Sequence, residues 1–504
     1  MKFAVIGGGL AGLTFGALAA KDGHKVTVYE KNAVPGGVVA LCEAGEYRFE
    51  QGPLLMCDLL PGEPMSNLLE KLGIKLELMR ADRNVEMPDY SLHRPKKYEG
   101  EYWRRDYLKK LFPEDADGLD KYYRFYDNMM RVRYRLNNTP SAGNMLGLAA
   151  AFLPVARYAR MTAQQLVEHF FTNPGLQALY TGILADYCAD PREVWGLAVP
   201  LTNLETGFDD RIPLERNGKH YLGGFGYVKG GCQKITEALA DVITANGGEI
   251  RLNTVVEQVM IENGRAVGVR LADGMCEEAD AVIGSGGGHD FFEKTVGTEH
   301  LDDAYRKILN TYRPMEAVFM VHLGVDFDPV EILGTALCYC YGSYDLPRAT
   351  ERLRSGVYHN GEDGFLMFVP SYHAPEFAPE GRHCLTIYTV APDTLRDGDW
   401  ETQKEAFADR LIACAERYLP ELKSHITMRK IMTAEDYRTL THMSKSSFGG
   451  TVPVWHQKNP PHKTPVKNLW FIGQQSENGG GLWAVANGAA LTYRACVKKN
   501  KQHR

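Results

Sequence analysis

A glycine-rich turn near the start of the chain, residues 7–12 (GGGLAG), fits the pattern G-x-G-x-x-G. The apolar run before it, residues 3–6, suits a buried parallel strand, and residues 13–21 after it suit a helix packed on that strand. A second apolar run, residues 26–29, ends at Glu30. Strand, turn, helix, strand and acid in this order form the fingerprint of a dinucleotide-binding fold.

Each part of this fingerprint has a chemical role. Gly7 permits the tight turn, Gly9 lets the backbone approach a pyrophosphate, and Gly12 lets the helix pack close to the strand. The start of the helix presents free N–H groups and a partial positive charge to the phosphates. Glu30 is placed to accept hydrogen bonds from the ribose of an adenosine.

The composition narrows the classes to which this chain can belong. Its 504 residues are enough for two or three domains, and its formal net charge of −6 does not favour a nucleic-acid partner. The 10 cysteines form no C-x-x-C pair and the 15 histidines no H-x-x-x-H pattern, so we expect no metal site and reduced, mostly buried cysteines. No apolar run reaches the ~20 residues of a membrane-spanning helix, and the apolar N-terminal stretch belongs to the nucleotide fold rather than to a signal peptide. We therefore expect a cytoplasmic protein.

Three separate segments read as pieces of one nucleotide-binding domain, and two long inserts lie between them. The first insert looks helical, whereas the second contains strand-like runs, so together they predict a mixed substrate domain. The expected boundaries are 1–56, 221–290 and 466–504 for the nucleotide-binding domain, and 57–220 and 291–465 for the substrate domain.

Hydrophobic periodicity predicts the local elements inside these segments. Thr162 with Gln165 resembles a capping box that starts a helix, and Cys338 and Cys340 should share one face of a strand. The other predictions are helices over 108–136, 233–246 and 482–496, and strands over 249–252, 255–261, 266–271, 280–283, 317–324, 384–390 and 469–472.

Two further glycine-containing elements follow the fingerprint along the chain. One combines residues 35–37 (PGG) with the F-x-x-G-P sequence of residues 49–53, which alone would suit two turns around a hairpin. The other is a strand that ends at Gly473, then glycines 479–481 and a helix with small residues, which alone would suit a closing strand–helix unit. The positive end of that helix suits the pyrimidine carbonyl of a flavin.

With these elements in this order, the chain resembles the phytoene desaturase group of FAD-dependent oxidoreductases, which includes carotenoid isomerases and retinol saturases. It is similar more distantly to flavin amine oxidases and protoporphyrinogen oxidase. In the middle of the chain the resemblance rests on Gly223-Gly224, Val256 with Val259, Gly268-Val269, Asp273-Gly274 and residues 279–283.

The resemblance implies an α/β fold: a Rossmann-type, glutathione-reductase-like FAD-binding domain with a mixed α+β substrate domain formed by the two inserts. It implies FAD as cofactor and desaturation, saturation or isomerisation of a C=C bond in a large apolar substrate of the polyene or isoprenoid type. Since no second G-x-G-x-x-G is present, electrons should come from, or leave to, a separate partner.

The resemblance also assigns cofactor contacts to individual residues. Val38 stands where relatives often have arginine, and Gln474 where many have an acid, so more of the phosphate binding falls to the backbone and the helix dipole. The predicted cofactor-binding residues are Gly7, Gly9, Leu10, Ala11, Gly12, Glu30, Lys31, Gly36, Gly37, Val38, Gly52, Pro53, Val256, Gly473, Gln474, Gly480, Gly481, Leu482 and Trp483.

Candidates for proton transfer are His220 and Tyr221, just before the Gly223-Gly224 pair, and Glu477, on the other side of the flavin; each also has a purely structural interpretation. Two alternative functions remain. A flavin amine oxidase would release hydrogen peroxide from amines, and a non-catalytic FAD-bound carrier or assembly factor would hold FAD that no small apolar substrate reduces or reoxidises.

The helical insert combines basic and aromatic residues over 121–135 with the apolar run 145–156. Two interpretations are open. The segment is an amphipathic helix with a solvated basic face, or it is a surface that meets a membrane.

Overall fold

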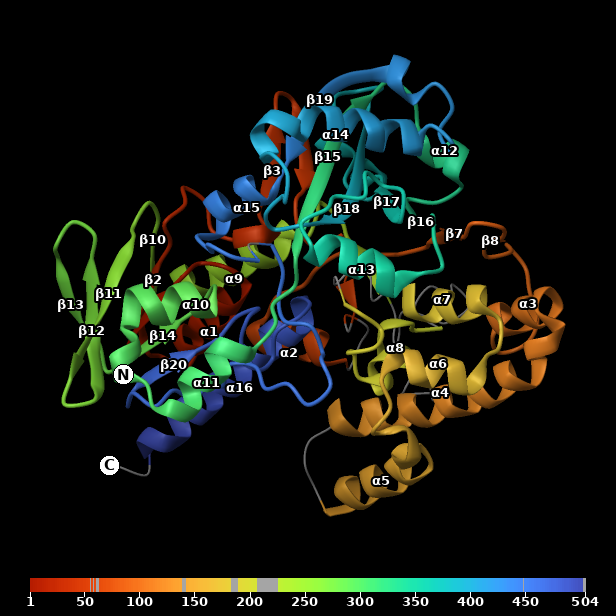
Figure 1. The fold of residues 1–504 in the computed structure, drawn as a ribbon. Coiled ribbons are helices and arrows are strands. Elements are labelled where there is room, and N and C mark those ends of the chain that lie inside the picture. The colour runs from red at the N-terminus through yellow and green to blue at the C-terminus, as the bar shows by residue number, and fades with distance from the viewer. Residues whose placement is uncertain are drawn as a thin grey trace.

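In the computed structural model the described residues are 1–54, 56–57, 59, 63–137, 142–182, 189–205, 225–446 and 448–501. Figure 1 shows a parallel sheet with its helices at the left, a larger sheet at the top and a lobe of helices at the lower right. Both ends of the chain lie on the side of the parallel sheet.

The parallel sheet unites strands from three distant parts of the sequence. Its order is β10-β2-β1-β14-β20, and every neighbouring pair is parallel. The strands are β1 Lys2–Ile6, β2 Lys25–Tyr29, β10 Glu249–Arg251, β14 Ala281–Gly284 and β20 Leu469–Phe471. The strands predicted over 249–252, 280–283 and 469–472 are confirmed to within one residue at each end.

Both faces of this sheet are covered, which is why its central strands are mostly apolar. Phe3 and Val5 of β1 pack against α1 (Leu10–Lys21), α9 (Gln233–Ala245) and α16 (Leu482–Lys501). On the other face, Ala4 packs with a three-stranded antiparallel sheet and with α11 (Asp303–Thr311). That sheet consists of β11 Val256–Glu262, β12 Arg265–Leu271 and β13 Cys276–Glu278.

The larger sheet holds the main hydrophobic core of the second insert. Its order is β19-β15-β18-β17-β16-β7-β8, antiparallel except for the pair β16–β7. Cys338 and Cys340 share one face of β16 as predicted, with 3.9 Å between their Sγ atoms. The strands are β7 Asn84–Glu86, β8 Ser91–Leu92, β15 Ala317–Val325, β16 Leu337–Tyr341, β17 Gly364–Phe368, β18 His383–Ala391 and β19 Ile426–Met432; the nearby helices are α12 Pro329–Leu333, α13 Leu346–Arg354, α14 Trp400–Ala415 and α15 Ala434–Thr441.

The helical lobe consists of α3 Trp103–Leu111, α4 Ala116–Asn137, α5 Ala142–Phe152, α6 Ala163–Phe170, α7 Pro174–Gly182 and α8 Val199–Thr202. The single helix predicted over 108–136 is wrong. Phe112 leaves the helix at φ −125°, ψ 70°, since Pro113 disfavours a helical residue before it and has no N–H to donate. The capping box of Thr162 and Gln165 is confirmed at the start of α6. Within the described ranges, no helix has both the length and the apolar composition that crossing a membrane requires.

Packing crosses the boundaries predicted from sequence in several places. The hairpin of β3 (Leu41–Ala44) and β4 (Tyr47–Glu50) belongs by sequence to the nucleotide-binding part, but it packs in the core of the larger sheet. Conversely, α2 (Pro64–Leu72) packs against α1 and α16, and α11 lies on the parallel sheet, although both fall in the predicted inserts. The remaining short elements are β5 Met56–Cys57, β6 Leu78–Arg80 and β9 Phe225–Val228, which form one sheet, and α10 Gly288–Asp290.

One histidine in the larger sheet is held away from water. His322 of β15 is 0% exposed, and its Nδ1 lies 2.9 Å from the Oγ1 of Thr386 on β18. Burial, with a smaller contribution from Lys430, lowers the pKa of His322 from 6.5 to about 3. The folded protein therefore holds this imidazole neutral in mildly acidic solution, whereas the unfolded chain protonates it.

This difference predicts a loss of stability in acid. Because the folded pKa lies below the unfolded one, the stabilisation is complete above pH 6.5 and decreases as the pH falls towards 3. Because of His322, we expect the free energy of unfolding at pH 5 to be about 2 kcal/mol lower than at pH 7.5. Urea unfolding at both pH values should show that His322→Leu reduces this drop, while the exposed His300→Leu leaves it unchanged. An equal drop in wild type and His322→Leu would contradict the prediction.

Candidate functional site

A cavity of about 630 Å³ lies at the carboxyl edge of the parallel sheet. Its wall includes Ile6 and Tyr29, the last residues of β1 and β2, and Ser285 and Gly473, which follow β14 and β20. In open parallel sheets, ligands bind in the crevice outside the carboxyl ends of the strands. The cavity therefore lies where the fingerprint predicts a ligand.

The turn between β1 and α1 opens into this cavity. Gly9, the N-cap of α1, has no side chain to occupy the first-turn N–H groups, and Gly9, Leu10 and Ala11 all line the cavity. No heavy atom of the described residues lies within 4 Å of a Cβ built on Gly9. A Cβ on Gly12 would instead lie 2.0 Å from the carbonyl oxygen of Gly7. Gly9 thus faces open space and Gly12 permits close packing.

Glu30 is buried beside this turn and already has two backbone partners. Its carboxylate accepts hydrogen bonds from the N–H of Gly8 at 2.7 Å and of Asn32 at 2.8 Å. The structure thus gives Glu30 a role that the sequence analysis omitted, which is to tie the glycine turn to the end of β2. A carboxylate offers about four acceptor positions, so capacity for a ribose remains.

Charged residues gather at this end of the cavity. Lys31 donates to the carbonyl of Thr439, and burial, opposed by Glu30, lowers its pKa. Asp290 accepts from Lys294 at 2.6 Å and from the N–H of Ser444 at 2.7 Å. Burial raises the pKa of Asp290, but these hydrogen bonds outweigh burial and the net shift is downward. Of this group, the sequence analysis had selected only Lys31.

The second glycine turn lies against the first. The N–H of Gly36 donates to the carbonyl of Gly8 at 2.8 Å, and Gly36, Gly37 and Val38 line the cavity. Gly52, Pro53 and Val256, which were also predicted from the resemblance, line it as well. The two glycine turns therefore form one wall.

The C-terminal segment forms the opposite part of the wall. Gly473, Gln474, Gly481 and Leu482 line the cavity. The side-chain amide of Gln474 donates to the carbonyl of Phe448 at 3.3 Å. The predicted residues Gly12, Gly480 and Trp483 are not among the lining residues. Gly12 and Gly480 instead allow close backbone packing, with Gly480 next to Gly450.

The other end of the cavity is apolar. Its residues come from β5, β9, β16, β17 and β18 and from loops next to them, and among those described none carries a formal charge. They are Leu54, Met56, Phe225, Met315, Tyr339, Leu366, Tyr388 and Phe448. The sequence analysis identified none of these residues, because they lie far apart in the chain and no local motif marks them.

Of the three predicted catalytic residues, Glu477 alone lies in the described part of the chain. Glu477 is not among the lining residues, and its Oε1 accepts from the N–H of His462 at 2.9 Å. This hydrogen bond holds the loop around His462, and the catalytic role of Glu477 stays a prediction. His220 and Tyr221 lie outside the described residues.

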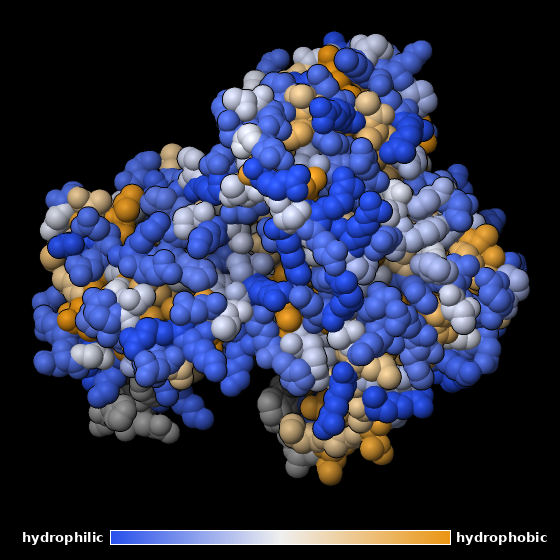
Figure 2. Space-filling model, in the orientation of Figure 1, coloured by the Kyte–Doolittle hydropathy of each residue, from blue (hydrophilic) through white to orange (hydrophobic). Residues whose placement is uncertain are grey.

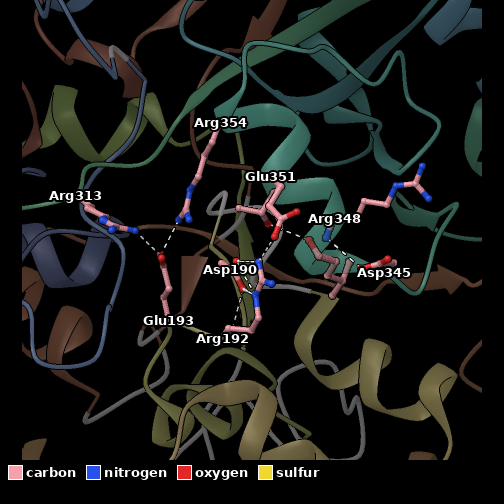
Figure 3. A network of polar contacts seen from close by, with 10 residues as sticks. Asp190, Arg192, Glu193, Arg313, Asp345, Arg348, Glu351 and Arg354 are labelled. Atoms are coloured by element: carbon pink, nitrogen blue, oxygen red, sulfur yellow. Dashed lines mark hydrogen bonds and ion pairs between the residues drawn. The ribbon is translucent and has the colours of Figure 1, made fainter.

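A network of ion pairs connects the helical lobe with the rest of the protein beside this cavity (Figure 3). Glu193 accepts from Arg313 at 2.6 Å and from Arg354 of α13 at 2.9 Å. Arg192 contacts Asp190 and Glu351, each at 2.6 Å. Burial raises the pKa of Glu193, but hydrogen bonds from the two arginines produce a net decrease. Arg313 lies two residues before Met315, a lining residue, so the network fixes the lobe next to the apolar end.

The residues present fit FAD, the cofactor that the resemblance implies. The first-turn N–H groups of α1 and the open space at Gly9 suit a pyrophosphate, and Glu30 retains acceptor capacity for a ribose. The same cavity continues from this polar end to an apolar end. A dinucleotide and an apolar molecule can therefore share one space.

Comparison with known proteins agrees with this geometry. The model of the family described as flavin containing amine oxidoreductase matches residues 10–489. Prolycopene isomerase from Arabidopsis thaliana is 25% identical over 518 residues, covering 98% of this chain and 82% of that protein. A lycopene-forming phytoene desaturase from Paracoccus sp. is 23% identical over 515 residues, covering 97% of this chain and 95% of the relative.

Solved structures show the same fold. An oxidoreductase from Methanosarcina mazei superposes with a TM-score of 0.68 at 20% identity, covering 98% of this chain and 100% of the other. A variant of putrescine oxidase gives a TM-score of 0.65 at 14% identity, with 99% of each chain covered. At these identities the likeness concerns the fold alone.

Proposed function

Because the chain belongs to the family of flavin-containing amine oxidoreductases, and is therefore an FAD-dependent enzyme, we propose that it acts on carbon–carbon bonds of a large apolar substrate of the polyene or isoprenoid type. The observation that carries this proposal is the continuity of one cavity from the glycine turns to an uncharged, aromatic-lined end. Relatives named prolycopene isomerase and phytoene desaturase, which match nearly the whole chain, favour this reaction over amine oxidation.

The chain's own residues would hold the cofactor. The start of α1 would bind the pyrophosphate, Glu30 the ribose and Val256 the adenine. Neither Val38 nor Gln474 adds a charge, so the backbone and the helix dipoles would supply most of the binding. When bound, FAD supplies a flavin ring that accepts or donates a hydride.

The apolar end would position the substrate and exclude water from it. Phe225, Leu366 and Phe448 offer hydrocarbon surface, and Tyr339 and Tyr388 add hydroxyl groups. The uncharged lining suits a polyene, and the residues described at this end offer no carboxylate to pair with an ammonium ion. We propose that the cofactor exchanges electrons with a separate donor or acceptor, and that desaturation, saturation and isomerisation are the candidate reactions. We also include a membrane surface among its partners, because such a substrate dissolves in lipid.

An anaerobic assay distinguishes these reactions. The purified holoenzyme is photoreduced and mixed with candidate polyenes or retinoids while the flavin spectrum is recorded. Reoxidation by an alkene indicates a saturase, bleaching of the oxidised enzyme by a more saturated analogue indicates a desaturase, and a changed double-bond geometry without net oxidation indicates an isomerase. Reduction by an amine, with hydrogen peroxide formed in air, would overturn the proposal, as would silence towards every polyene.

A further inference from the structure

Helix α5 exposes apolar side chains to an unusual degree. Leu146 and Met145 of α5 are 74% and 57% exposed, and Leu153, the first residue after the helix, is 77% exposed. Figure 2 shows hydrophobic residues gathered at the bottom of the view, where Figure 1 places α5. A patch of this kind on one element marks an interaction surface.

The exposed residues form the outer side of a helix that is anchored on its inner side. Leu148 and Ala151 pack against the core of the helical lobe, and α5 lies along α4. Residues 142–152 (AGNMLGLAAAF) contain no charged side chain. A helix that is apolar on every side normally lies in a protein core or in lipid, yet the outer side of α5 is exposed.

The charges that flank α5 in the sequence are of one sign. The sequence has no acidic residue between Asp127 and Glu168, whereas Arg131, Arg157 and Arg160 in this interval are exposed. The chain as a whole carries a net charge of −6, so this basic surface stands out from its surroundings. A surface that combines apolar side chains with a basic rim is complementary to anionic lipid head groups above hydrocarbon.

We propose that α5 and the turn after it are a docking surface for an anionic lipid bilayer. Met145, Leu146 and Leu153 would enter the boundary between head groups and acyl chains, and Arg157 and Arg160 would contact lipid phosphates. Eleven residues are too few to span a bilayer, so the helix would lie in its plane. Resting on the proposed function, this docking would place the enzyme on the phase in which an apolar substrate dissolves.

Vesicle co-sedimentation of the holoenzyme tests the proposal. The protein should sediment with vesicles of phosphatidylcholine and phosphatidylglycerol and much less with phosphatidylcholine alone. The triple variant Met145→Gln, Leu146→Gln, Leu153→Gln should bind about tenfold more weakly or worse, because it removes the inserted apolar area. The matched control Met275→Gln, Ile332→Gln changes residues that are 54% and 52% exposed elsewhere and should bind like wild type.

A second pair of measurements isolates the charge contribution. Arg157→Gln with Arg160→Gln should lower binding to the anionic vesicles by about tenfold at 0.1 M salt, and high salt should diminish this difference. Wild type that ignores anionic vesicles, or a triple variant that binds as well as wild type, would overturn the proposal. So would a wild-type dimer that the triple variant converts to a monomer, since α5 would then join two copies of the chain.

Failure of this proposal and failure of the proposed function are separable. Vesicle binding needs no substrate, and the anaerobic assay can be run with the polyene in detergent. An enzyme that turns over polyene in detergent but ignores vesicles would refute docking alone, and the reverse result would refute the reaction alone.

Discussion

Replacing Gly9 with alanine is expected to leave the apoprotein folded but to weaken FAD binding by about 10- to 100-fold. The new Cβ meets no described atom within 4 Å, and Gly9 has an ordinary φ of −76°, so the fold should accept it. The same Cβ would occupy the space into which a pyrophosphate must come, and overpacking of this kind costs about 1–3 kcal/mol. FAD titration by flavin fluorescence and thermal unfolding of the apoprotein measure the two effects separately.

Two glycine variants serve as comparisons. Gly12→Ala places its Cβ 2.0 Å from the carbonyl oxygen of Gly7, a backbone atom that cannot move aside, so it should destabilise the apoprotein itself. Gly143→Ala, at a helical site on α5 with open space around it, should change neither quantity. Wild-type FAD affinity in Gly9→Ala would show that the phosphates bind away from the start of α1.

Replacing Glu205 with glutamine should destabilise the helical lobe by about 3–5 kcal/mol. Arg104 and Glu205 form a buried pair whose side chains are 8% and 2% exposed. The Nε of Arg104 donates to Oε2 of Glu205 at 3.0 Å, its Nη2 donates to Oε1, and the hydroxyl of Tyr123 donates to Oε2 at 2.8 Å. In the Glu205→Gln variant, the guanidinium of Arg104 stays buried but loses the negative charge of its partner.

Urea unfolding followed by tryptophan fluorescence measures this loss. The double variant Arg104→Met, Glu205→Leu should recover much of it, because an apolar pair of similar volume avoids burying charge. Asp120→Asn is the matched control: its ion pair with Lys109 is about one-third exposed and should contribute about 1 kcal/mol or less. A Glu205→Gln variant no less stable than Asp120→Asn would mean that other groups neutralise Arg104.

Local rules account for the parts of the fold that were predicted well. The unit from β1 to β2 follows from the glycine turn and two apolar runs, and the capping box at Thr162 follows from a spacing of three residues. The strands predicted over 317–324 and 384–390 correspond to β15 and β18. β15 is one residue longer at its C-terminal end, and β18 is one residue longer at each end. The break at Pro113 could also have been predicted locally, because proline restricts the residue directly before it, but the helix predicted over 108–136 ran through it.

The sequence by itself determined the glycine turn at the start of α1, where we propose that a nucleotide binds, because the sterics of glycines 7, 9 and 12 act over a few neighbouring residues. Only the tertiary structure decided which side chains line the rest of the cavity beside this turn. Leu54, Met315 and Tyr388 meet there because strand order and register bring distant segments together. Glu477 accepts a hydrogen bond from the N–H of His462 for the same reason. Packing between two loops brings these residues together, and the periodicity of a single segment does not predict such a contact.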